Sequence, residues 1–345
     1  MAERVKRRSV VFESPHRVGV REEDVPTPAA NQVLVATTVS AISAGTELLF
    51  YRGEAPSDVA VDETIAALSG ELRYPLIYGY ACVGEVIEAG EGVDSAWVGR
   101  LVFAFSPHTS HFLASVSDLI AVPSELAPEE AVFLPNMETA VNLVMDGHPL
   151  IGERVVIMGQ GVVGLLTCGL LAAHPLARLV TLDRCANRRK WSRALGATHC
   201  FDPVTPDLAR QVAALWETHE SPTGADLIFE LTGNPEALDL AIDLAGYDSR
   251  IVIGSWYGRK RWPIGLGGRF HRSRIQLISS QVSTIAPRWS GRWNKERRFG
   301  TAWKMIERLR PAQLITHRLP VVAAAEAYTL LDQHPCEAIQ VVFTY

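Results

Sequence analysis

The sequence predicts an α/β protein in which a small β-rich domain accompanies a doubly wound parallel sheet. Two different sequence patterns along the 345 residues support this prediction. Up to about residue 125, short β-type runs are separated by Gly and Pro, which is typical of an irregular β domain. From about residue 153, apolar strand-like runs alternate with helical stretches, and this alternation favours a parallel sheet covered on both faces.

The expected elements follow from these patterns. In the first part, β-type runs are expected at residues 32–43, 81–90, 99–106 and 118–123. In the second part, strands are expected at 154–159, 178–183, 225–233, 250–256 and 274–282. The helices between them are expected at 163–174, 188–197, 207–219 and 235–246. Two further helices, at 300–309 and 324–333, and a strand at 338–345 are expected after them.

The composition argues against several classes of function. With 48% hydrophobic and 21% charged residues, the chain has apolar material for about two domains. The 33 basic and 38 acidic residues give a net charge of −5 without a long block of one sign, which argues against a nucleic-acid partner. The longest apolar stretch, 161–173, is shorter than the roughly 20 residues that cross a bilayer. We therefore expect a cytoplasmic protein without a membrane partner.

The strongest chemical signal is a GxGxxG motif formed by Gly159, Gly161 and Gly164. It follows an apolar strand and opens an apolar helix through Val162 and Val163. Glycine permits the tight turn, the approach of backbone to a pyrophosphate and the packing of helix on strand, while the amides at the helix start hold phosphates. The motif predicts a dinucleotide site.

The next predicted strand ends in Asp183, about 20 residues past the motif, where an acidic side chain binds the ribose hydroxyls of NAD. Its charge would repel the 2′-phosphate of NADP, so we expect NAD. Arg184 and Arg188 lie close by and leave NADP as the alternative. Thr232, Gly233, Gly254 and Ser255 follow the fourth and fifth strands, where open α/β sheets bind ligands, and are candidates for the nicotinamide half.

Two stretches interrupt the alternating pattern. Residues 55–73 form a long insertion in which 62–69 are expected to be helical, and insertions of this length often carry function. In residues 286–299, Trp289 and Trp293 are interleaved with basic residues. That composition suits an anionic ring, a solvated face or a subunit contact.

The chain is similar to the medium-chain dehydrogenase/reductase superfamily over nearly its whole length. The resemblance is carried by residues 43–47 (SAGTE), 74–90, 136–142, the glycine motif and 194–197 (ALGA). More narrowly, residues 44–53, 105–108 and 270–283 look like the branch labelled 2-desacetyl-2-hydroxyethyl bacteriochlorophyllide a dehydrogenase-like. The resemblance implies a GroES-like catalytic domain from residues 1–136 and 281–345 and a Rossmann domain from 137–280.

The residues at the superfamily's zinc-ligand positions depart from its pattern. Ala44 stands where zinc members have cysteine, Tyr80 where they have histidine, and Pro135 or Asn136 at the third position. None of these side chains is a zinc ligand. The five cysteines contain no CxxC pair, so the clustered cysteines of a structural zinc lobe are also missing. We therefore expect no metal.

Without zinc, hydrogen-bond donors must stabilise the developing alkoxide and carry its proton. The resemblance places Thr46 and Tyr80 against the substrate oxygen. His108 follows a strand on the same side, and imidazole suits proton exchange near neutral pH. We expect these three as catalytic residues and favour His108 over Tyr80 as the proton donor, with His111 less favoured.

Together these features predict a zinc-independent NAD(P)-dependent oxidoreductase that interconverts a secondary alcohol and a ketone. The substrate is expected to be a medium-sized or bulky small molecule, and a chlorin side chain, a cyclitol, a sugar or a pterin-like ring would each fit. The enzyme is expected to be a homodimer. One alternative is a zinc-free enone or quinone reductase of the same superfamily. Another is a non-catalytic dinucleotide-binding protein.

Overall fold

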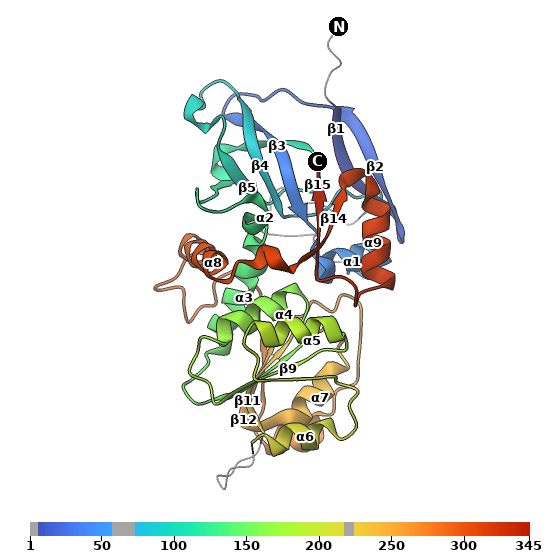
Figure 1. The fold of residues 1–345 in the computed structure, drawn as a ribbon, viewed down its shortest axis with the longest axis vertical. Coiled ribbons are helices and arrows are strands. Elements are labelled where there is room, and N and C mark those ends of the chain that lie inside the picture. The colour runs from blue at the N-terminus through green and yellow to red at the C-terminus, as the bar shows by residue number, and fades with distance from the viewer. Residues whose placement is uncertain (1–5, 57–72, 217–223) are drawn as a thin grey trace. The chain divides into compact units, whose positions relative to one another are not determined.

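The computed structural model describes residues 6–56, 73–216 and 224–345. The chain divides into two compact units, Met1–Pro135 with Arg310–Tyr345, and Asn136–Leu309 (Figure 1). The first boundary lies within one residue of the expected position. The return to the first unit comes at Arg310 instead of residue 281, because helix α8 (Lys295–Leu309) packs on helix α4 (Val162–Leu171) of the second unit.

The first unit is built on β-sheet. Strands β1 (Lys6–Ser14) and β2 (Arg17–Asp24) form an antiparallel hairpin. A seven-stranded sheet has the order β14-β15-β3-β4-β5-β7, with β6 paired to β3; its pairs are antiparallel except β14 with β15. Its strands are β3 (Gln32–Ala41), β4 (Cys82–Ala89), β5 (Leu101–Ala104), β6 (His111–Ser115), β7 (Leu119–Ala121), β14 (Ile315–Pro320) and β15 (Gln340–Thr344).

Helix α1 (Ala44–Arg52) follows β3 in a stretch that the sequence analysis left without a helix. It ends at Gly53, whose φ of +70° is the left-handed conformation that glycine adopts without strain. Helix α9 (Ala324–Gln333) packs on α1 and β2, and Phe12 meets Tyr328 edge to face with ring centroids 4.9 Å apart. The remaining helical turns are α2 (Pro128–Ala131), η2 (Ser95–Trp97), η3 (Val116–Asp118), η5 (Pro311–Leu314) and η6 (Val321–Ala323).

The second unit contains a six-stranded parallel sheet in the order β10-β9-β8-β11-β12-β13. Numbered within the unit, this is 3-2-1-4-5-6, the order of a dinucleotide-binding Rossmann sheet. The strands are β8 (Arg154–Met158), β9 (Arg178–Leu182), β10 (His199–Phe201), β11 (Ala225–Glu230), β12 (Ala245–Ile253) and β13 (Gln276–Ser279). The expected parallel sheet is thus present, with β10 added.

Helices cover both faces of this sheet, because successive side chains of a strand point to opposite faces. Val156 and Met158 of β8 pack in the core that includes α6 and α7. Val155 and Ile157 pack on the other face in the core that includes α3 and α4. The helices are α3 (Leu134–Gly147), α4, α5 (Ala186–Ala194), α6 (Leu208–Ala214), α7 (Ala237–Leu244), the short η4 (Leu266–Phe270) and α8.

The insertion at residues 55–73 falls mainly outside the described residues. Within the described ranges, no helix has the length and apolar character needed to cross a bilayer.

Candidate active site

The glycine-rich turn lies between β8 and α4 and requires glycine at two of its positions. Gly159 has φ of +88°, and a Cβ there would lie 2.6 Å from the carbonyl oxygen of Leu231. A Cβ on Gly164 would lie 2.0 Å from the carbonyl oxygen of Gly159. At Gly161, the N-cap of α4, a Cβ would meet no described atom within 4 Å. The turn is therefore tightly packed behind Gly159 and Gly164 and open at Gly161.

The open side of the turn suits a phosphate. Val162 and Val163 form the first turn of α4, where backbone N–H groups lack partners inside the helix. These groups and the positive end of the helix dipole favour an anion. The backbone here can therefore hold the pyrophosphate of a dinucleotide.

Asp183 lies directly after β9 and is 8% exposed. Its Oδ2 accepts a hydrogen bond from the backbone N–H of Gln160 at 2.6 Å, and its Oδ1 accepts one from Cys185 at 2.8 Å. These bonds hold the carboxylate against the glycine-rich turn. The second lone pair of each oxygen is left to accept from a ribose hydroxyl.

The arginines near Asp183 occupy different environments. Arg188 lies with Nη1 4.0 Å from Asp183 Oδ2, and burial lowers the pKa of Arg188, an effect that the Asp183 charge opposes. Arg189 donates to the carbonyl of Asp183 at 2.6 Å and to Asp202 at 3.0 Å. Arg184 is exposed. Arg188 is therefore the arginine whose charge acts most directly on Asp183.

Gln160 is a functional residue that the sequence analysis missed. Its side chain is completely buried; Nε2 donates to the carbonyl of Gly159 at 3.0 Å, and Oε1 accepts from Ser192 of α5 at 2.7 Å. The motif allows any residue at this position, so the sequence carried no signal for it. Gln160 fixes the turn to the neighbouring helix.

The expected nicotinamide-half residues meet at the ends of β11 and β12. The Gly233 N–H donates to Ser255 Oγ at 2.9 Å, and a Cβ on Gly254 would lie 2.6 Å from the side chain of Leu231. The Thr232 N–H donates at 2.8 Å to Glu230, a completely buried carboxylate that the sequence analysis did not single out. Glu230 thus ties the two strand ends together.

Tyr257 completes this cluster by donating from its hydroxyl to Glu230 Oε2 at 2.6 Å. Burial and the Glu230 charge raise the pKa of Tyr257 well above its ordinary value. The phenol therefore stays protonated and acts as a donor.

In the first unit, two of the three expected catalytic residues, Thr46 and Tyr80, lie close together. Thr46 sits in the first turn of α1, and Tyr80 precedes β4. The Tyr80 phenol oxygen hydrogen-bonds Ser43 Oγ and lies 3.4 Å from Thr46 Oγ1. The Tyr80 hydroxyl thus contacts both Thr46 and Ser43, the N-cap of α1, and these three residues form a hydroxyl cluster.

His108 occupies a different place from the one expected of a proton donor. Its side chain is completely buried, with Nδ1 2.7 Å from Ser40 Oγ and Nε2 3.0 Å from Glu47 Oε2. Both ring nitrogens are engaged inside the protein, so neither is presented to a substrate. The geometry therefore reverses the expected order and favours Tyr80 over His108. His111 is half-buried and hydrogen-bonds Ser110 Oγ through Nδ1 at 3.0 Å.

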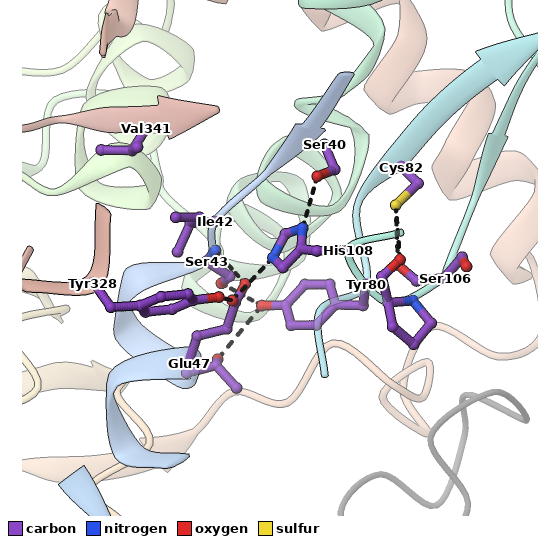
Figure 2. Close-up of polar contacts among 12 residues, drawn as sticks. Ser40, Ile42, Ser43, Glu47, Tyr80, Cys82, Ser106, His108, Tyr328 and Val341 are labelled. Carbon is purple, nitrogen blue, oxygen red and sulfur yellow. Dashed lines mark hydrogen bonds and ion pairs between the residues drawn. The ribbon is translucent and has the colours of Figure 1, made fainter. Parts of the chain in front are cut away.

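Glu47 is the centre of this buried network (Figure 2). Besides His108, it accepts hydrogen bonds from the backbone N–H of Ser43 at 2.6 Å and from the Tyr328 hydroxyl. Burial, followed by the Glu47 charge, raises the pKa of Tyr328 well above its ordinary value. Ser40 Oγ also hydrogen-bonds the Tyr345 hydroxyl at 2.7 Å. The network fixes the start of α1, where Ser43 and Thr46 lie.

The residues of this cluster do not fit a zinc ion. Ala44 offers a methyl group, and the Tyr80 oxygen is hydrogen-bonded to a hydroxyl. The nearby Cys82 thiol is buried and donates to the Ser106 carbonyl at 3.2 Å, and burial raises its pKa strongly, which disfavours the thiolate that binds zinc. In the described parts of the chain, no three His, Cys, Asp or Glu side chains form a metal-binding group.

Comparisons with known proteins agree with this architecture. The family model described as "Zinc-binding dehydrogenase" matches residues 162–295. D-guloside 3-dehydrogenase from Escherichia coli K12 is 23% identical over 359 residues, covering 98% of this chain and 100% of that protein. Starvation-sensing protein RspB from the same strain is 24% identical over 374 residues, covering 98% and 99%. Over nearly its whole length the chain is thus similar to dehydrogenases of the medium-chain, zinc-binding type. This similarity supports the expected superfamily, and the narrower branch stays a prediction.

Solved structures of dehydrogenases share the fold of this chain. A protein described as a short chain alcohol dehydrogenase (rspB) from E. coli CFT073, complexed with NADH, has a TM-score of 0.78 at 19% identity, and the match covers 99% of both chains. A zinc-binding dehydrogenase from Sinorhizobium meliloti 1021, bound to NADP, has a TM-score of 0.77 at 19% identity and covers 99% of this chain and all of that one. The GroES-like and Rossmann fold class expected from the sequence is confirmed.

Proposed function

We propose that this protein is a zinc-independent, NAD-dependent medium-chain dehydrogenase that interconverts a secondary alcohol and a ketone. The observation that carries the proposal is the hydroxyl cluster of Ser43, Thr46 and Tyr80, in which Tyr80 stands where the zinc-binding superfamily pattern has a histidine ligand. Hydrogen-bond donors aimed at one point can stabilise an alkoxide in place of a Lewis acid. The cluster therefore supports oxygen chemistry without zinc.

The roles of the residues follow from their contacts. Tyr80 donates to the substrate oxygen and exchanges its proton, while Thr46 accepts or donates beside it. Glu47 and His108 hold the start of α1 so that these hydroxyls keep their arrangement. Bound nicotinamide supplies the hydride acceptor or donor, and the amides of Val162 and Val163 hold its pyrophosphate.

The cofactor preference rests on Asp183. Its carboxylate is held facing the glycine-rich turn, where it accepts from ribose hydroxyls and repels a 2′-phosphate. The neighbouring Arg188 weakens that repulsion, so NADP binding is reduced and not abolished. The two solved relatives, one with NADH and one with NADP, support a nicotinamide cofactor of either kind.

For the substrate we propose a ring that carries a secondary hydroxyl. D-guloside 3-dehydrogenase, named for a sugar derivative, supports a polyhydroxylated ring as the first class to test. A cytoplasmic homodimer remains part of the proposal. Enone reduction is the alternative, because it needs a similar donor to an oxygen while hydride goes to a carbon–carbon double bond.

The proposal is tested on the full chain purified without added metal. NAD or NADP is mixed with a panel of sugars, glycosides, cyclitols and simple secondary alcohols, and formation of reduced nicotinamide is followed by absorbance. Activity that survives chelator treatment, with well under one zinc per chain by elemental analysis, is expected. Activity that disappears on chelation and returns with zinc would contradict zinc independence. Turnover of enones alone would favour the alternative.

A further inference from the structure

Arg298 is a completely buried arginine on a helix whose neighbouring residues are charged and exposed. It belongs to α8, where Lys295, Glu296 and Arg297 face solvent. Burying a guanidinium is costly unless all of its N–H groups find acceptors. The position of this side chain therefore calls for a specific explanation.

All five N–H groups of Arg298 are hydrogen-bonded. Nε and Nη2 donate to Glu138 Oε1 at 2.9 and 2.7 Å, and Nη1 donates to Asn142 Oδ1 at 2.6 Å. The two remaining N–H groups donate to backbone carbonyls, at 3.1 Å to Thr284 and to Val282. The guanidinium thus joins helix α3 to the segment after β13.

The same face of α3 anchors this segment at a third point. Asn142 and Asp146 follow Glu138 at intervals of four residues, so the three side chains line one side of the helix. Asn142 Nδ2 donates to Ser280 Oγ at 3.0 Å, and Ser280 Oγ donates to Asp146 Oδ2 at 2.7 Å. Alternate residues Ser280, Val282 and Thr284 are therefore all fixed by buried polar groups.

The anchored segment lies at the carboxyl edge of the sheet. Ser280 N–H donates to the Ile253 carbonyl at 3.0 Å, which extends the pairing of β13 with β12 to the strand end. In a sheet of this order, β8 to β10 bind one mononucleotide and β11 to β13 bind the other. β13 is the edge strand of this sheet, so the segment that follows it has a neighbouring strand on one side only.

We propose that residues 280–284 form a fixed wall of the nicotinamide-mononucleotide half of the cofactor site, and that Arg298 is the positioning residue that holds this wall. The inference rests on the dinucleotide binding proposed above and extends it to a residue outside the glycine motif. Arg298 acts through the carbonyls of Val282 and Thr284. Its loss should therefore weaken binding of the nicotinamide half and spare the adenosine half.

The test compares two ligands on three variants of the full chain. NADH contains both halves, whereas ADP-ribose lacks nicotinamide, and calorimetry measures the affinity of each. Arg298→Lys keeps the positive charge and loses the planar guanidinium with its five N–H donors. Ser280→Ala removes the hydroxyl that hydrogen-bonds Asn142 and Asp146, with little change of volume. Arg308→Lys is the matched control at an exposed position of α8. We expect NADH to bind about tenfold more weakly to Arg298→Lys and about fivefold more weakly to Ser280→Ala. ADP-ribose affinity should stay within about twofold, and the control should match wild type.

The outcomes separate the inference from the proposed function. If wild type binds neither NADH nor ADP-ribose, the proposed dinucleotide function fails. If wild type binds both and the two variants lose NADH and ADP-ribose equally, Arg298 has a general structural role and the inference is wrong. Unchanged NADH affinity in Ser280→Ala and Arg298→Lys would overturn it as well. Ser280→Ala keeps the test decisive if Arg298→Lys does not fold.

Discussion

The Nε2 atom of His108 lies 3.0 Å from Oε2 of Glu47, and both side chains are completely buried. Glu47 in turn accepts a hydrogen bond from the Ser43 N–H, so the pair holds the N-terminal turn of α1, which carries the hydroxyl cluster residues Ser43 and Thr46. A histidine that looked like a proton donor in the sequence thus supports the hydroxyls that we propose to contact substrate.

The first prediction concerns this pair. His108→Ala should lower the free energy of unfolding by about 3 to 5 kcal/mol, because it leaves the buried Glu47 carboxylate without one of its donors. Denaturant unfolding measures this loss. His111→Ala, at a half-buried position three residues along, is the control and should cost much less. A His108→Ala protein of wild-type stability with a kcat lower by 10² or more would restore the direct acid–base role.

Tyr80→Phe should lower kcat by roughly 10²- to 10⁴-fold, because it removes the proposed proton donor. Stability should change little, since the ring that packs against Tyr78 is kept. Tyr247→Phe, at an exposed position, serves as the control and should leave kcat unchanged. Steady-state kinetics that show a higher KM with unchanged kcat would mean that Tyr80 fills space and does not donate.

Replacing Asp183 should change cofactor choice. Asp183→Asn removes the charge that repels a 2′-phosphate while keeping a side chain of the same shape. We expect NAD to bind more weakly and the preference for NAD over NADP to narrow by about tenfold, the equivalent of about 1.4 kcal/mol. Dissociation constants for both cofactors test this. A wild-type protein that already prefers NADP tenfold would show that Arg188 outweighs Asp183.

Two glycines of the motif should respond differently to alanine. Gly164→Ala places a Cβ 2.0 Å from the Gly159 carbonyl oxygen, so the melting temperature should fall. At Gly161 a Cβ meets no described atom within 4 Å, so Gly161→Ala should keep wild-type stability and yet weaken NADH binding by crowding the pyrophosphate. Equal losses of stability in the two variants would contradict this picture of the turn.

Stability should depend on pH through His111. Burial lowers the pKa of His111 below its ordinary value of 6.5, so the unfolded chain binds a proton more readily than the folded one. The folded state is therefore favoured as the pH rises from the lowered pKa of His111 to about 6.5, and loses that advantage as the pH falls through the same range. His111→Gln should flatten this part of the curve of unfolding free energy against pH. A curve identical to wild type would show that His111 does not contribute.

The elements with local signals could be predicted, and those that depend on distant contacts could not. The Rossmann strands and the glycine-rich turn were found because alternation and GxGxxG are local patterns. Gln160 and Arg298 carried no signal, because their importance comes from burial against residues far along the chain. The burial of His108 was missed for the same reason: the sequence showed an imidazole near the expected site and gave no sign of its contacts with Ser40 and Glu47.

The bond between Gln160 and Ser192 bears on attempts to redesign this protein for a different cofactor. Because α5 carries both Ser192 and Arg188, a substitution that shifts this helix also shifts the phosphate-binding turn and the backbone N–H that holds Asp183. Substitutions at these positions should therefore be epistatic, with combined effects that differ from the sum of single ones. A library that varies residues 160, 183, 188 and 192 together should reach cofactor preferences that stepwise selection misses.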